Sequence, residues 1–162
     1  MSRRVSISSA PGGGVVVDLP PELRELLVSV ARQMREVLTE DEYADSPALA
    51  RLLPTAVPDD PMASLGFEQL MGQAIRDGKV ESARILEATA MQQRLDQEET
   101  LAWLRCINDV RLMIGTHLDV TEDEGRIEEF MSDPATEHAA IVYIALSELI
   151  ELLVRAVDRD QQ

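Results

Sequence analysis

Residues 101–120, LAWLRCINDVRLMIGTHLDV, are the feature that most constrains what this chain can fold into. At about 100° per residue in an α-helix, apolar side chains cover most of the circumference of this stretch. The polar strip that remains is narrow and contains Arg105, Asp109 and Thr116. A helix that is apolar on most sides is buried among other elements. The stretch therefore predicts the central helix of a helical bundle.

Two polar residues interrupt the apolar arc of this helix, Arg111 in its middle and Asn108 within it. The planar guanidinium of Arg111 suits carboxylate and phosphate groups. One interpretation is a structural ion pair inside the core, for which Glu81 is a candidate partner. The alternative is a ligand-binding site for a small anion, centred on Arg111 and with Asn108 orienting it. We favour the ion pair, because buried charges are normally paired.

The rest of the chain predicts a mostly α-helical single domain over residues 1–162, with four to five helices around the central one. A small N-terminal β-hairpin is expected at about residues 4–18, around a glycine-rich turn. Prolines at helix starts and a capping box at Asp96–Glu99 delimit the helices. The helices are expected over about 20–39, 47–53, 61–92, 97–117 and 134–158. Because Asp77-Gly78-Lys79 interrupts the third, it is either one bent helix or two short ones. The acidic residues that follow the central helix indicate a solvated connection.

Two of these helices carry further expectations. The first is amphipathic, and its periodicity places Arg24, Glu25, Arg32 and Glu36 on a solvated face. In the last helix, the apolar arc over residues 141–157 is wider than the edge of a bundle needs. This width predicts contact with a second subunit, and hence a homodimer.

The charge balance excludes several classes of partner. The chain has 30 acidic and 15 basic residues, which gives a net charge of −15. This charge repels phosphate backbones and anionic membranes, so we expect no nucleic acid and no membrane as partners. No apolar run approaches the roughly 20 residues of a spanning helix, and no signal peptide is recognisable. A cytoplasmic location is therefore expected.

The motifs of common catalytic and metal sites are missing from the sequence. The single cysteine, Cys106, provides neither a disulfide framework nor the usual structural zinc site, and its place on the apolar arc predicts an inert core thiol. Aligning Gly125 with the glycine of an EF-hand loop leaves no carboxylate at either end of that loop. His117 and His138 belong to no dense ligand set, and His117 suits a capping role at a helix end. We therefore assign no catalytic residue, no metal and no cofactor.

Two segments carry a resemblance to a known family. The first runs from Trp103 through Asn108, Asp109 and Arg111 to Gly115, and the second is LPTAVPDD at residues 53–60. Together they resemble an uncharacterised actinobacterial family described as a domain of unknown function, over nearly the whole chain. Members of that family are often encoded beside an adaptor of the Clp protease, which implies a link to Clp-type proteolysis. The family commonly has arginine at the position of His117, and the resemblance supplies no catalytic residues.

The sequence thus leads to two functional hypotheses. The first is a cytosolic, non-enzymatic protein-interaction or regulatory module that has a protein partner and forms a homodimer. The alternative is a small-anion-binding protein or enzyme with a pocket at Arg111 and Asn108. An opening beside Arg111 favours the second hypothesis, and a dry ion pair there favours the first.

Overall fold

The computed structural model describes residues 4–39, 61–118 and 126–160. Along the chain the elements are β1 (Ser6–Ser9), β2 (Val15–Asp18), α1 (Pro21–Thr39), α3 (Pro61–Thr89), β3 (Arg94–Leu95), α4 (Gln97–His117), α5 (Arg126–Ser132) and α6 (Glu137–Asp160). The predicted fold class, mostly α with an N-terminal hairpin, is confirmed. The helix expected over residues 47–53 lies outside the described residues.

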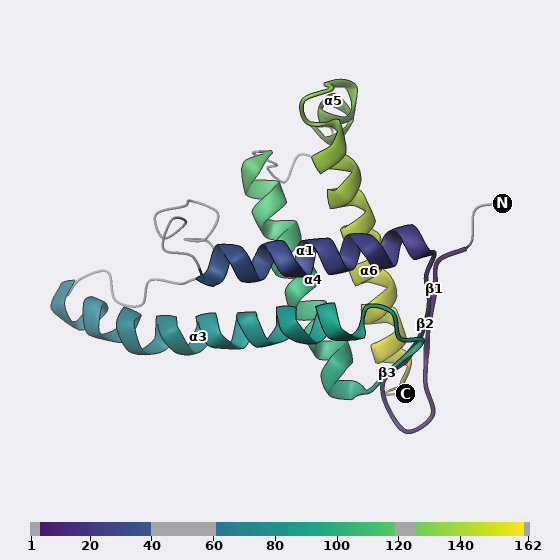
Figure 1. Cartoon of the computed structure of the whole chain (residues 1–162), viewed down its shortest axis with the longest axis horizontal. Coiled ribbons are helices and arrows are strands. Elements are labelled where there is room, and N and C mark those ends of the chain that lie inside the picture. The colour runs from purple at the N-terminus through teal and green to yellow at the C-terminus, as the bar shows by residue number, and fades with distance from the viewer. Residues whose placement is uncertain (1–3, 40–60, 119–125, 161–162) are drawn as a thin grey trace.

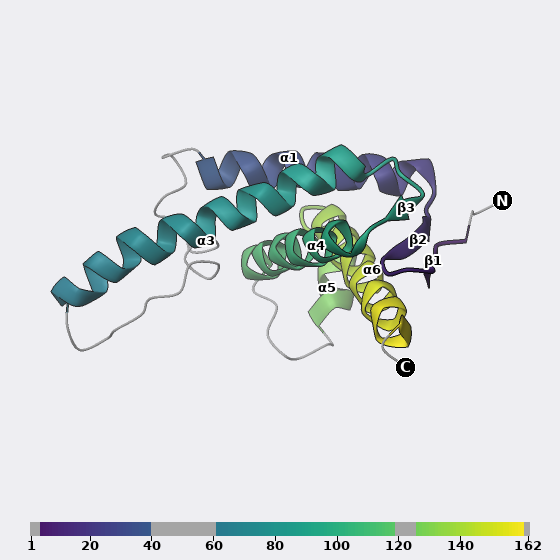
Figure 2. The ribbon, with the colours of Figure 1, turned by 90° about the horizontal axis from the view of Figure 1, so that it is seen from below.

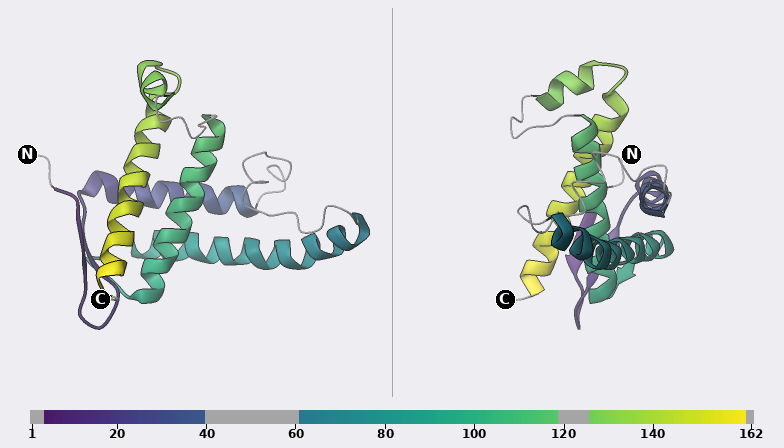
Figure 3. Two further views of the ribbon diagram at one scale, coloured as in Figure 1. Left: turned by 180° about the vertical axis from the view of Figure 1, so that it is seen from behind. Right: turned by 90° about the vertical axis from the view of Figure 1, so that its left-hand side faces the viewer.

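The long helices form two crossed layers (Figures 1 and 2). α1 and α3 lie side by side and run in opposite directions in one layer. α4 and α6, also antiparallel to each other, cross behind them in the view of Figure 1 and in front of them in the left view of Figure 3. The small sheet stands at one end of α1, and α5 lies at the far end of α6. The halves of α4 and α6 nearest α5 extend beyond the layer of α1 and α3.

The central position of α4 is confirmed by its burial. Trp103 and Ile107 are completely buried, and Cys106 is 1% exposed. The indole Nε1 of Trp103 donates a hydrogen bond to Thr89 Oγ1 of α3 at 2.7 Å, which satisfies the one polar atom of this large side chain. Leu101, expected on the apolar stripe, is instead 39% exposed.

The sheet is antiparallel and has the order β1-β2-β3. Ile7 pairs with Val17 in the hairpin, and Val15 pairs with Leu95 of β3. The sequence did not predict β3, because a strand of two residues has no period to detect. The turn between β1 and β2 contains three glycines with positive φ, Gly12, Gly13 and Gly14.

Most helix boundaries follow from capping chemistry. The capping box predicted at the start of α4 is present, with Asp96 Oδ1 accepting from the Glu99 amide and Glu99 Oε2 accepting from the Asp96 amide.

α3 is one helix, and it ends at Thr89 rather than near Gln92 because the chain turns there toward β3. α5 was not predicted, since its sequence was interpreted as part of the acidic connection. α6 begins at Glu137, three residues after the predicted start, because Asp133 caps a separate turn before it.

The prediction that Arg24 faces solvent is wrong. Arg24 is 9% exposed, and its guanidinium donates to four backbone carbonyls. Nη1 bonds to Ala90 O at 2.8 Å and to Gln92 O at 2.7 Å. Nη2 bonds to Val17 O at 3.0 Å, and Nε bonds to Leu19 O at 3.4 Å. Arg24 thereby joins β2, α1 and the end of α3, and periodicity within one helix cannot show that these segments cover it.

None of the described helices is long and apolar enough to cross a membrane.

Candidate functional site

Arg111 lies on the side of α4 that faces α6. Gly115, one turn later on the same face, is so close to α6 that a Cβ added there would meet Tyr143 Cε2 at 3.3 Å. Arg111 is half-buried, and its Nη2 donates to Asn108 Oδ1 at 2.9 Å. The structure thus brings together the two residues that the sequence singled out.

The carboxylate partner suggested for Arg111 is wrong. Glu81 is exposed and accepts from Arg84 Nε at 2.8 Å, three residues later on the same helix. This hydrogen bond lowers the pKa of the Glu81 carboxyl. Within the described part of the chain Arg111 forms no ion pair, so the dry ion pair is not observed there.

The buried ion pair of α4 is instead formed by Asp109, which the sequence placed on the polar strip. Asp109 is 6% exposed, and Lys79 Nζ of α3 donates to both of its carboxylate oxygens at 3.0 Å. Burial raises the pKa of the Asp109 carboxyl, although Lys79 opposes this rise. A polar strip on a helix can face another helix as well as solvent, and α3 covers this one.

Cys106 lies one turn before the pair, and it has no features of a nucleophile. Burial, together with the negative charge of Asp109, raises the pKa of the Cys106 thiol to about 12. The thiolate needed for nucleophilic attack or metal binding is therefore scarce at neutral pH. The predicted burial of this thiol is confirmed.

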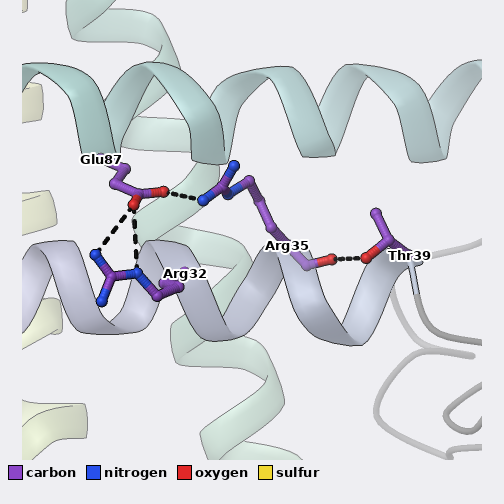
Figure 4. Close-up of polar contacts among 4 residues, drawn as sticks. All are labelled: Arg32, Arg35, Thr39 and Glu87. Atoms are coloured by element: carbon purple, nitrogen blue, oxygen red, sulfur yellow. Dashed lines mark hydrogen bonds and ion pairs between the residues drawn. The ribbon is translucent and has the colours of Figure 1, made fainter.

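A second polar cluster joins α1 to α3 (Figure 4). Arg32 and Arg35 of α1 both contact the carboxylate of Glu87, with Arg32 Nη2 at 3.3 Å from Oε1. Arg35 Nε is buried without a hydrogen-bond partner. The cluster holds the arginine side chains of α1 against α3 and away from the opposite side of α1.

On that opposite side, an apolar groove of about 320 Å³ lies between α1, α4 and α6. One wall is an apolar stripe of α1 at the spacing of helical turns: Leu26, Val30, Met34 and Val37. The α4 and α6 residues of its lining belong to the halves of these helices that extend past α1 in Figure 1.

The other walls of the groove come from α4 and α6. They consist of Val110, Met113 and Ile114 on α4, and of His138, Ala139 and Val142 on α6. Ser29 and Gln33 of α1 complete the lining as polar residues. His138 is the one histidine of this lining, and it is exposed.

Sequence reasoning missed the groove, although it left a signal. The apolar residues of α1 form two stripes, and only one of them, with Leu27, Ala31 and Leu38, is fully buried in the core. In the stripe at the groove, Val30 and Met34 are also buried, whereas Leu26 and Val37 are half-buried. An apolar arc wider than one packing contact needs was detected in α6, and the same criterion applied to α1 would have indicated this surface.

Metal chemistry finds no support in the described ranges. Among residues 4–39, 61–118 and 126–160 there is no group of three or more His, Cys, Asp or Glu side chains placed to hold a metal ion. The acidic run at 121–125, considered as a calcium loop, lies outside the described residues, and so does the side chain of His117.

The comparison with protein families agrees with the resemblance seen in the sequence. The model of the family described as "Domain of unknown function (DUF2017)" matches residues 4–157. The chain belongs to this family. No curated protein and no solved structure matches the chain. The family assignment therefore supplies neither an activity nor site residues, and the functional argument rests on the geometry.

Proposed function

We propose that this member of the DUF2017 family is a cytosolic, non-enzymatic protein-interaction module, and that it binds the apolar face of a partner in the groove between α1, α4 and α6. The observation that carries this proposal is the composition of the groove. Its lining is mostly aliphatic and comes from three helices. The exposed residues of the lining are polar, such as Gln33 and His138, and apolar residues such as Leu26 and Ile114 are half-buried beside them. Apolar surface that can be reached from solvent is typical of interaction sites.

Enzymatic chemistry is less well supported by the same surface. A catalytic site needs a nucleophile or a general base oriented by a further group. Among the described residues of the groove, the His138 side chain forms no hydrogen bond, and the Ser29 hydroxyl accepts from Gln33 of its own helix at 3.3 Å. The proposal therefore assigns binding, and not catalysis, to the groove.

Site-specific photocrosslinking tests this proposal. A photoreactive residue at Gln33, inside the groove, should crosslink a discrete protein in extracts of the source cells. The same residue at Asp158, exposed near the end of α6, is the matched control. The captured protein, once purified, should bind the wild type and lose affinity for Ala139→Phe, which fills the groove. Equal crosslinking from both positions, or equal binding to Ala139→Phe, would contradict the proposal.

Two further parts of the hypothesis belong to the same proposal. We expect the partner to connect the protein to Clp-type proteolysis, on the strength of the family resemblance alone. We also expect a homodimer, because Ile141 and Val154 on α6 are 47% and 42% exposed. Both residues lie in the apolar arc that predicted a second subunit.

The alternative function, binding of a small anion at Arg111, is supported by one observation. The guanidinium is half-buried, and the partner it contacts is an amide and not a carboxylate. An anion would complete its hydrogen bonding. Titration with inorganic phosphate, followed by calorimetry on the wild type and Arg111→Ala, tests this alternative. A saturable heat of phosphate binding that is present in the wild type and absent in Arg111→Ala would support the anion-binding function.

A further inference from the structure

The α1 rim of the groove carries charges of one sign. On α1, Glu25 lies one turn before Ser29, and Glu36 lies one turn after Gln33, so both acids continue the polar edge of the groove. Glu22 is in the same relation to Leu26. All three glutamates are exposed, and none forms an ion pair within the described residues.

The basic residues of α1 do not neutralise this rim. Arg32 and Arg35 contact Glu87 on the α3 side of the helix, and Arg24 is buried against backbone carbonyls (Figure 4). The lining itself includes no lysine and no arginine. On the α6 side, Glu137 is exposed in the same helical turn as His138. On the α4 side, Arg111 lies one turn before Ile114 and donates to Asn108. The result is an apolar floor whose borders on α1 and α6 are acidic.

The length of the groove indicates what kind of segment it accepts. From Leu26 to Val37 the α1 wall is eleven residue steps long, which corresponds to about 16 Å at the rise of an α-helix. A partner helix of about three turns matches this length, and it would place apolar residues at i, i+3 or i+4, and i+7 into the groove. We propose that the natural occupant is an amphipathic helix of another protein, with an apolar face flanked by lysine or arginine. This inference rests on the proposed function and specifies the partner of the same groove.

Two other occupants fit the charges less well. A second copy of this chain carries the same net charge of −15, so its approach to an acidic rim is repelled. A small apolar molecule would fill the floor of the groove without making use of the carboxylates. A basic helix uses both features, because the rim attracts and orients it and the floor buries its apolar face.

The test starts from an unbiased peptide library. Randomised peptides of about 16 residues are displayed and selected on the full chain at about 150 mM salt. We expect the enriched peptides to combine helical apolar spacing with a net positive charge. Enrichment of neutral or acidic peptides, or no enrichment at all, would overturn the inference.

Charge reversal on the rim is the second arm of the test. Glu25→Lys/Glu36→Lys should weaken binding of a selected peptide by about tenfold or more. Glu148→Lys/Asp158→Lys changes the net charge by the same amount on exposed positions of α6 outside the groove lining, and it should change affinity by less than about threefold. Equal effects of the two double variants would show that only the overall charge matters, and would overturn the inference.

Methionine methyl resonances locate the bound peptide. Met34 and Met113 line the groove, whereas Met91 is 59% exposed at the turn after α3. Binding should shift the first two signals and leave Met91 unchanged. A shift of Met91 alone would overturn the inference, as would groove signals that change when the protein is diluted by itself, which indicates a second copy.

The outcomes separate this inference from the proposed function. If the selected peptides are not basic, yet lose their binding to Ala139→Phe, the groove is an interaction site without a preference for positive charge. If Ala139→Phe leaves peptide binding unchanged, the proposed function fails as well. Gln33→Trp obstructs the groove from an exposed position and replaces Ala139→Phe if that variant does not fold.

Discussion

Arg24 shows how one side chain can connect segments far apart in the sequence. Its guanidinium satisfies carbonyls of β2, of the chain before α1 and of the turn after α3. Removing the donor leaves buried acceptors without partners, and this costs more than a hydrogen bond contributes. We predict that Arg24→Met lowers the free energy of unfolding by about 3–5 kcal/mol in urea melts.

The matched control for this prediction is Arg32→Met on the same helix. The Arg32 side chain is 59% exposed and contacts Glu87 from solvent. Exposed ion pairs contribute about 0–1 kcal/mol, so the control should stay within that range. Equal losses in the free energy of unfolding for the two variants would mean that the carbonyl contacts of Arg24 stabilise the fold no more than an exposed ion pair does.

Arg111 is expected to behave differently from Arg24. Within the described residues its side chain forms one hydrogen bond, to Asn108, and it is half-buried. Arg111→Ala should therefore lower the free energy of unfolding by about 1 kcal/mol, the value of a single hydrogen bond. Urea melts without added ligand measure this change. A loss of about 3–5 kcal/mol would instead indicate a carboxylate partner and would restore the structural ion pair.

Asp109 makes stability depend on pH in a direction that is unusual for a carboxylate in an ion pair. Its pKa is raised above the ordinary 3.8, first by burial, with Lys79 acting in the opposite direction. The folded state therefore binds this proton more readily than the unfolded chain. The contribution of Asp109 to stability is fully present below 3.8 and is lost as the pH rises through the folded pKa.

This reasoning predicts the comparison with Asp109→Asn, which has no proton to gain at this position. Between about pH 7 and about pH 4, the wild type should gain stability relative to the variant as the pH falls. Urea melts at several pH values within this window provide the measurement. If the wild type instead loses stability relative to Asp109→Asn as the pH falls, the attraction of Lys79 outweighs burial in setting the pKa of Asp109.

At the scale of elements, the hairpin turn and β3 depend on each other through Gly14. A Cβ at Gly14 would lie 2.0 Å from Leu95 O, whereas a Cβ at Gly12 meets nothing within 4 Å. Both glycines have positive φ. Gly12→Ala should therefore cost about 1–2 kcal/mol from backbone strain alone. Gly14→Ala should cost about 1–3 kcal/mol more, because β3 must move. Thermal unfolding of the two variants would show the difference, and equal losses would contradict it.

The elements differ in how far the sequence predicts them. The bounds of α4 are marked by the Asp96–Glu99 capping box and by a long apolar period, and the prediction of 97–117 matches the structure. α5 is a helix of seven residues in an acidic context, and β3 has two residues, so neither contains a full period of any pattern. Such elements are determined by what they pack against.

The candidate site was harder to predict than the fold for the same physical reason. Arg111 and Asn108 stand out within one helix, and the structure brings them together. The groove needs three helices at a particular crossing, and the Lys79–Asp109 pair needs two. A single-helix periodicity contains no information about which neighbour covers a given side. The width of the apolar arc of α1 was the one signal available.

At the scale of the whole molecule, a net charge of −15 opposes any self-association. Exposed apolar side chains on α6 favour it, since Ile141 and Val154 are 47% and 42% exposed. The charges between these two residues are partly balanced, as Arg155 pairs with Glu151 of the same helix. Which effect prevails depends on ionic strength, because the Debye length falls from about 10 Å at 0.1 M salt to about 3 Å at 1 M.

We therefore predict a homodimer whose stability increases with salt. Light scattering at micromolar concentration should give a dimer mass, and the dimer fraction should be larger at 0.5 M than at 0.05 M sodium chloride, because screening weakens the repulsion while the apolar contact remains. Ile141→Glu should shift the protein to monomer. Leu101→Glu, on an exposed position of α4, should leave the dimer unchanged. A monomer mass across the whole salt range would remove the dimer and would leave the exposure of Ile141 and Val154 to be explained by another contact.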